Sequence, residues 1–209
     1  RFKMTTEMQK KMTELEELLK KIKINSQKRD NKNKKNFSLN FQFGMGRSIN
    51  ALNAGGFETP HNFIKGRGVF MKPIDEQNIP KWKKNLWYAA KEILLEIDPV
   101  YAENDDFVVN FAHMNDSQNH FVKKHTDNCD ISFQYALALG EFTGGELTVE
   151  SSTGETNTID FQRKILKVDG RLPHQVETFC GDRYTVIFYK LFDRTKSEKD
   201  PVFEPAVIV

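Results

Sequence analysis

Two histidines and one aspartate in the second half of the chain have the types and spacing to bind a metal ion. His125 and Asp127 form a His-x-Asp pair, and His174 follows well downstream. On an extended strand, side chains at positions i and i+2 point the same way, so the pair would share one face. A third ligand from a distant strand would complete the set. The pair alone is a weak motif, because about 0.3 such pairs are expected by chance in this composition.

Two imidazoles and one carboxylate on one side of a metal leave other positions open for small molecules. That arrangement is typical of non-haem Fe(II) oxygenases. A structural zinc site fits less well, since zinc prefers four closed N/S ligands and Cys129 and Cys180 form no paired motif. We interpret Cys129 as a small buried thiol. The remaining histidines are interpreted as surface or packing residues: His61, His113 and His120.

The elements that would position this triad are short strands, because beyond Asp105 the apolar residues recur with a period of two. Eight candidate strands are predicted, over 107–113, 118–125, 131–139, 146–150, 155–161, 164–168, 174–179 and 183–192. In the third strand, the odd-numbered residues from Ile131 to Leu139 face one way and the even-numbered residues the other. The predicted fold is mainly β with flanking helices, a two-sheet jelly roll or double-stranded β-helix.

Two amphipathic helices are predicted upstream of the strands. Over 4–24 the apolar residues are spaced by four, three, four and three, which is too short for a convincing coiled coil. This helix is expected to pack against the domain or against another chain. Residues 76–97 form the second helix, with Pro80 in its first turn and an end at Asp98-Pro99. Its apolar stripe is expected to cover the outside of a sheet.

Length and composition indicate one domain with a sizeable core, at 209 residues and 38% hydrophobic. We divide the chain into a basic helical segment and linker over 1–36, a domain over 37–193 and a tail over 194–209. The strand core covers about 107–192. Residues 1–50 carry 13 Lys and Arg against 5 Asp and Glu, so this arm could contact a polyanion or simply be solvated.

Residues 37–73 are aromatic, rich in glycine and basic. One interpretation is turn chemistry, in which glycine supplies positive φ. The other is a substrate-binding loop in which Arg47, Lys65 and Arg67 contact phosphates while aromatic rings stack on bases.

No apolar run approaches the roughly 20 residues of a membrane span, so no membrane association is expected. No signal peptide is visible, and a chain that begins at Arg1 rather than Met is compatible with a fragment of a longer protein. Two cysteines do not form a disulfide framework in a chain of this size. An intracellular location, in the nucleus or the cytoplasm, is expected.

Residues 107–192 resemble the double-stranded β-helix core of the Fe(II)/2-oxoglutarate-dependent dioxygenases. The matching pattern is His125-x-Asp127, Gly-Gly-Glu-Leu over 144–147, His174, and then Gly181-x-Arg183-x-Thr185. A cupin of another activity would share the fold and the histidines. Such a protein would not call for the Arg-x-Thr pair after the last ligand.

The resemblance implies that His125, Asp127 and His174 are the Fe(II) ligands and the catalytic residues. It also implies two cosubstrates, 2-oxoglutarate and O2. Arg183 and Thr185 would bind the far carboxylate of 2-oxoglutarate, since the arginine fork matches a carboxylate. Asn110 matches a position where some members place a polar contact to the cosubstrate.

The stretches over 135–149 and 174–185 are similar to the TET/JBP-like branch, which oxidises methylated bases in nucleic acid. This likeness implies a nucleic-acid partner and a role in DNA modification, with a duplex base flipped out of the stack. Arg183 lies nine residues after His174, whereas several members of that branch place the arginine farther past the last histidine. Such spacing is usual in prolyl-hydroxylase-like enzymes, so a prolyl or lysyl peptide is the alternative substrate. A non-catalytic jelly-roll binding module is the third interpretation.

Overall fold

The structure is a computed structural model that describes residues 5–22, 39–44, 56–58, 72–74, 79–103, 107–115, 120–128, 130–190 and 199–209. Its helices are α1 (Thr6–Lys21), α2 (Lys81–Ile97) and α3 (Pro99–Ala102). The first strands are β1 (Leu39–Gly44), β2 (Gly56–Glu58), β3 (Lys72–Ile74), β4 (Val108–Asn115), β5 (His120–His125) and β6 (Gln134–Leu139). The others are β7 (Phe142–Gly144), β8 (Leu147–Glu150), β9 (Thr156–Ile159), β10 (Ile165–Val168), β11 (His174–Tyr189) and β12 (Val207–Ile208).

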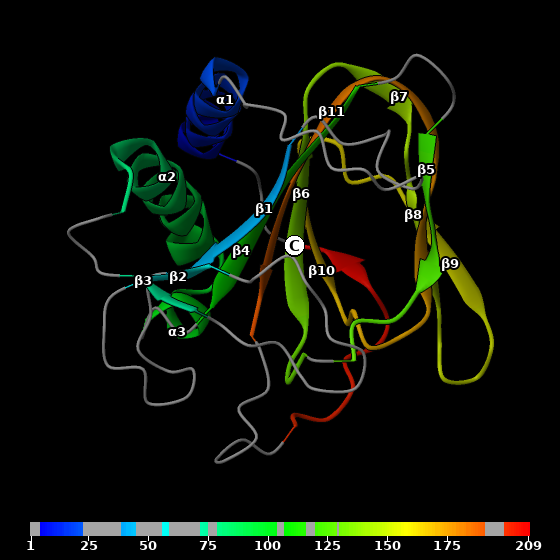
Figure 1. The fold of residues 1–209 in the computed structure, drawn as a ribbon. Helices are drawn as coiled ribbons and strands as arrows, with labels where there is room; N and C mark the ends of the chain where they lie inside the picture. Colours follow the sequence, from blue (N-terminus) through cyan, green and yellow to red (C-terminus); the bar gives the residue numbers. More distant parts are fainter. Residues whose placement is uncertain are drawn as a thin grey trace.

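The strands form two antiparallel layers that share strand β11 (Figure 1). The larger layer has the order β12-β10-β6-β11-β4-β1-β2-β3. The smaller layer pairs β5 on one side of β11 and β7 and β8 on the other, with β9 beyond β8. This pairing is that of a jelly roll, so the predicted mainly β fold with flanking helices is confirmed.

Strand β11 passes from the smaller layer to the larger one without a break. Its pairing with β7 ends at Gly181, and its pairing with β4 begins at Asp182. Gly181 has a φ of 112°, and a Cβ there would lie 2.3 Å from the Glu141 carbonyl oxygen. The sequence prediction of two separate strands is wrong here, because this glycine bends one strand instead of starting a turn.

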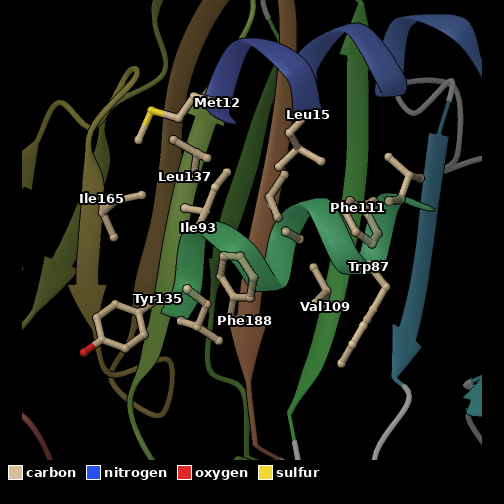
Figure 2. Close-up of a cluster of buried hydrophobic side chains, with 14 of the residues drawn as sticks. Met12, Leu15, Trp87, Ile93, Val109, Phe111, Tyr135, Leu137, Ile165 and Phe188 are labelled. Atoms are coloured by element: carbon tan, nitrogen blue, oxygen red, sulfur yellow. The ribbon is translucent and has the colours of Figure 1, made fainter. Parts of the chain in front are cut away.

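A helical layer covers the outer face of the larger sheet (Figure 2). Met12 and Leu15 of α1 and Trp87 and Ile93 of α2 are fully buried against strand residues such as Phe188. The apolar face of α1 is thus used within the chain, and pairing with another chain stays a prediction. None of the described helices combines the length and apolar character of a membrane span.

The second predicted helix starts later than expected. Pro80 is the N-cap of α2, and the helix begins at Lys81 and ends at Ile97. After Asp98, the short helix α3 follows, with the Asp98 side chain accepting a hydrogen bond from the Tyr101 amide. Residues 79 and 80 are therefore not helical, and the predicted start at residue 76 is wrong in this part. The fixed φ of proline suits the entry to a helix better than its interior.

A second apolar cluster fills the space between the layers. Ala136 and Ala138 of β6 contact this cluster, whereas Tyr135, Leu137 and Leu139 of the same strand face the helices. The predicted alternation over 131–139 is therefore confirmed for β6. In the segment predicted as a tail, β12 pairs antiparallel with β10.

Candidate metal centre

His125, Asp127 and His174 converge at one end of the smaller layer. One ligand atom from each lies within 4.8 Å of the others, which is close enough for a single metal ion. Nε2 of His125 is 3.8 Å from Oδ1 of Asp127, and Nε2 of His174 is 3.8 Å from Oδ2 of the same residue. The structure therefore brings the three predicted ligands together.

Both imidazoles are oriented by main-chain carbonyls two residues upstream. Nδ1 of His125 lies 2.8 Å from the carbonyl oxygen of Lys123, and Nδ1 of His174 lies 2.9 Å from that of Leu172. A carbonyl oxygen can only accept, so each Nδ1 donates its proton in the neutral ring. Each Nε2 then presents its lone pair toward Asp127, as a metal ligand requires.

A β-bulge in β5 allows the His125 ring to face His174. His174 pairs with His125 and Val176 with Val122, so β5 contains one residue more than β11 over this interval. Val122 and His125 are three residues apart, and a regular strand would place them on opposite faces. The extra residue instead lets Val122 pack on the apolar cluster between the layers. The centroid of the His125 ring then lies 4.3 Å from that of the His174 ring.

Asp127 does not reach the centre as the second residue of a strand. Strand β5 ends at His125, and Asp127 lies in the following loop. Its backbone amide donates to the Gly170 carbonyl at 2.7 Å, and its Oδ2 accepts from Gln134 Nε2 at 2.8 Å. The expectation of a shared strand face is wrong in this detail, because tertiary hydrogen bonds place the carboxylate.

Burial sets the protonation state on one side of the centre. It lowers the pKa of His174, and the neighbouring His125 adds to this, which outweighs the opposing effects of the Leu172 carbonyl and Asp127. A neutral imidazole is the form that binds a metal. The side chains of His125 and Asp127 are 43% and 37% exposed, against 10% for His174. The centre is therefore open to solvent on the side of β5.

Arg183 is a buried cation on the inner face of β11. Its side chain lies among the rings of Phe142, Phe161 and Phe179, at 5.3 to 5.6 Å from their centroids. It donates to Thr185 Oγ1 at 2.7 Å, and a second bond reaches the Gly145 carbonyl at 3.4 Å. Among the described residues it has no carboxylate partner, and its Nε has no acceptor. An unpaired buried charge is costly, which favours a site for an acid.

Asn110, which is predicted to make a polar contact to the cosubstrate, lies on β4 beside β11. Asn110 pairs with Ile187 across β4 and β11, two residues along β11 from Thr185. Its Oδ1 is buried and has no hydrogen-bond partner among the described residues. A polar atom left in this way is a candidate contact for a bound molecule.

The other residues singled out by the sequence lie apart or cannot be placed. His113 stacks on Tyr184 and contacts Asp182 at 3.0 Å, away from the triad. Cys180 is exposed. Several residues lie outside the described residues: Arg47, Lys65, Arg67, His61 and Cys129. The side chain of His120 on β5 is not described either.

Sequence reasoning missed Gln134 and Asp130 as parts of the centre. Gln134 Nε2 donates to Asp130 Oδ2 at 2.5 Å as well as to Asp127. Burial raises the pKa of Asp130 to about 8, against the effect of the Gln134 hydrogen bond. The available signal was a polar residue on the inner face of β6, in line with Ala136 and Ala138.

Comparisons with known proteins give partial structural likenesses. No protein-family model and no curated protein matches the chain. An oxidoreductase of the 2OG-Fe(II) oxygenase family from Burkholderia pseudomallei is similar over 66% of this chain and 70% of its own, with 15% identity and a TM-score of 0.45. A Pseudomonas putida prolyl-4-hydroxylase is similar over 55% and 65%, with 17% identity and a TM-score of 0.39.

A mutant of Bacillus subtilis oxalate decarboxylase is also similar, over 44% of this chain and 22% of its own. Its identity is 9% and its TM-score 0.34. The chain thus spans less than a quarter of that protein. The jelly roll itself is defined by the strand pairing of this chain.

Proposed function

We propose that the chain is an Fe(II)- and 2-oxoglutarate-dependent dioxygenase that hydroxylates a C–H bond. The observation that carries this proposal is the occurrence, on β11, of a candidate metal ligand and a buried arginine without a carboxylate partner among the described residues. A metal centre alone fits many jelly rolls. An added cationic site on the same strand supports a small acid bound beside the metal.

In this proposal His125, Asp127 and His174 hold Fe(II) and leave positions for 2-oxoglutarate and O2. Arg183 and Thr185 bind the far carboxylate, and Asn110 makes a further polar contact. Bound Fe(II) supplies O2 activation, with oxidation of 2-oxoglutarate to succinate and CO2. The protein orients the ligands through the Lys123 and Leu172 carbonyls.

The substrate in this proposal is the methyl group of a modified base in nucleic acid, as in the TET/JBP-like branch. The likeness of residues 135–149 and 174–185 to that branch supports it, and so does the basic charge of the first 50 residues. The solvent-exposed side of the centre at His125 leaves an approach for a large substrate.

A prolyl or lysyl peptide is the second candidate substrate. The observation in its favour is that Arg183 follows His174 by nine residues. Both residues lie on the uninterrupted strand β11. A non-catalytic binding module is disfavoured because all three ligand side chains converge.

The test measures succinate release from 2-oxoglutarate in the presence of Fe(II) and ascorbate. Four conditions are compared: methylated DNA, unmethylated DNA, a proline- or lysine-bearing peptide, and no added substrate. An Asp127→Ala variant is run beside each assay. Turnover that rises with methylated DNA and is lost in the variant supports the base oxygenase. Turnover that depends on Asp127 but responds only to the peptide moves the substrate to proteins. Absence of turnover under every condition would contradict the proposal that the chain is a dioxygenase.

A further inference from the structure

The Gln134 side chain joins the carboxyl groups of two aspartates at the edge of the candidate metal centre. Gln134 is the first residue of β6, and its Nε2 donates to Asp127 Oδ2 at 2.8 Å and to Asp130 Oδ2 at 2.5 Å. Gln134 is 5% exposed and Asp130 3%. One amide nitrogen carries two N–H groups, so each of them can donate to one of the two carboxyl groups.

Asp127 needs such a restraint because it lies outside the strands. Its loop follows β5, and the backbone is fixed by the hydrogen bond from its amide to the Gly170 carbonyl. That bond leaves the side-chain torsions free. The bond from Gln134 to Oδ2 restrains the carboxylate in the orientation that places Oδ1 3.8 Å from His125 Nε2 and Oδ2 3.8 Å from His174 Nε2.

Gly170 keeps space for this amide. A Cβ added to Gly170 would lie 2.3 Å from Gln134 Nε2 and 2.9 Å from Asp127 Oδ2. Gly170 follows β10, whose last residue, Val168, pairs with Gln134. Asp127 is therefore held by the side-chain amide of Gln134 on β6 and by the backbone carbonyl of Gly170 just after β10.

We infer that Gln134 is a positioning residue for the metal ligand Asp127, holding its carboxylate between the two histidine side chains. This inference rests on the proposed metal centre and adds a residue that does not itself touch the metal. Outer residues that orient ligands typically change metal affinity by about 10- to 100-fold when removed.

The test uses Co(II), a stand-in for Fe(II) that resists oxidation by air, and the whole chain without its native metal. Co(II) affinity is measured by calorimetry, and the visible d–d bands report the ligand geometry. Gln134→Met keeps the length of the side chain and removes both donors. The matched control is Gln162→Met, since the Gln162 amide also donates to two acceptors, the Gly140 and Phe142 carbonyls at 3.2 and 3.3 Å.

Gln134→Met is expected to weaken Co(II) binding by about 10- to 100-fold and to shift the d–d bands, while Gln162→Met retains both. Unchanged affinity and bands in a folded Gln134→Met variant would overturn the inference. If that variant does not fold, the same measurements on Gln134→Asn decide the question, because its shorter amide cannot reach both carboxyl groups. Absence of Co(II) binding to the unaltered chain would instead contradict the metal centre itself.

Discussion

His174 and Arg183 lie on one strand but in different layers of the jelly roll. His174 pairs with His125 and Val149 in the smaller layer, whereas Arg183 pairs with Met114 in the larger one. The bend at Gly181 separates them. The candidate metal centre and the candidate carboxylate site are therefore connected by a single stretch of backbone, which fixes their relative position.

Replacing the buried arginine should weaken the proposed binding of 2-oxoglutarate without unfolding the protein. Burial lowers the pKa of Arg183 to about 10, so the group is still charged at neutral pH. For Arg183→Met we expect 2-oxoglutarate affinity to fall by about 2–5 kcal/mol, since the carboxylate would lose its buried partner. Calorimetric titration in the presence of Co(II) measures this.

The same variant should unfold at a denaturant concentration no lower than that of the unaltered chain. Removal of a buried charge that lacks a carboxylate partner relieves a desolvation cost. Thr185→Val serves as a milder comparison, because it removes only the hydroxyl that accepts from Arg183. The preceding prediction on affinity would be contradicted if Arg183→Met bound 2-oxoglutarate as tightly as the unaltered chain.

A buried ion pair should hold residues 199–209 against the sheets. Arg171 donates to both oxygens of Asp169, which is fully buried, and to the carbonyls of Asp200 and Pro201. Arg171→Leu leaves a buried carboxylate unpaired, so we expect a loss of about 3–5 kcal/mol in the free energy of unfolding. Urea denaturation measures it.

The double variant Asp169→Asn/Arg171→Leu is the control for that experiment. It removes the stranded charge and should recover part of the loss. Limited proteolysis would report release of the 199–209 segment in the single variant. A loss below about 1 kcal/mol would mean that water or another group replaces Arg171.

The contact between α1 and the loop before β10 should make stability depend on pH in the acid range. Burial by itself would raise the pKa of Glu16, but hydrogen bonds from Lys20 and Arg163 outweigh it, so the pKa is lowered from 4.5. The unfolded chain then binds the proton more readily than the folded chain. The stabilisation is present above about pH 4.5 and is lost as pH falls through the folded pKa.

Glu16→Gln should therefore be less stable than the unaltered chain at pH 7, and the difference should shrink on acidification. Urea unfolding at several values between about pH 7 and pH 3 gives the two curves. Glu17→Gln is the matched control, since Glu17 is the neighbouring carboxylate on α1 and 52% exposed. Curves for Glu16→Gln and the unaltered chain that stay parallel would contradict this prediction.

The sequence predicted the alternating faces of β6, because these follow from a local pattern. The convergence of His125, Asp127 and His174 was predicted from their types and from the resemblance to the dioxygenases. The sequence did not predict how Asp127 is held, since Gln134 and Gly170 reach it only through tertiary structure. The continuity of β11 was missed for a related reason. A glycine at position 181 indicates a turn in sequence, yet the same positive φ also suits a bend within a strand.

The short strand β12 covers an apolar strand at one edge of the larger layer. It pairs with β10 (Figure 1). Ile165, Leu166 and Val168 of β10 are all buried. Without residues 207–208, this apolar strand would form an open sheet edge, and such edges recruit strands from other molecules. Loss of the Arg171 contacts would therefore favour aggregation, even though the metal ligands themselves are unchanged.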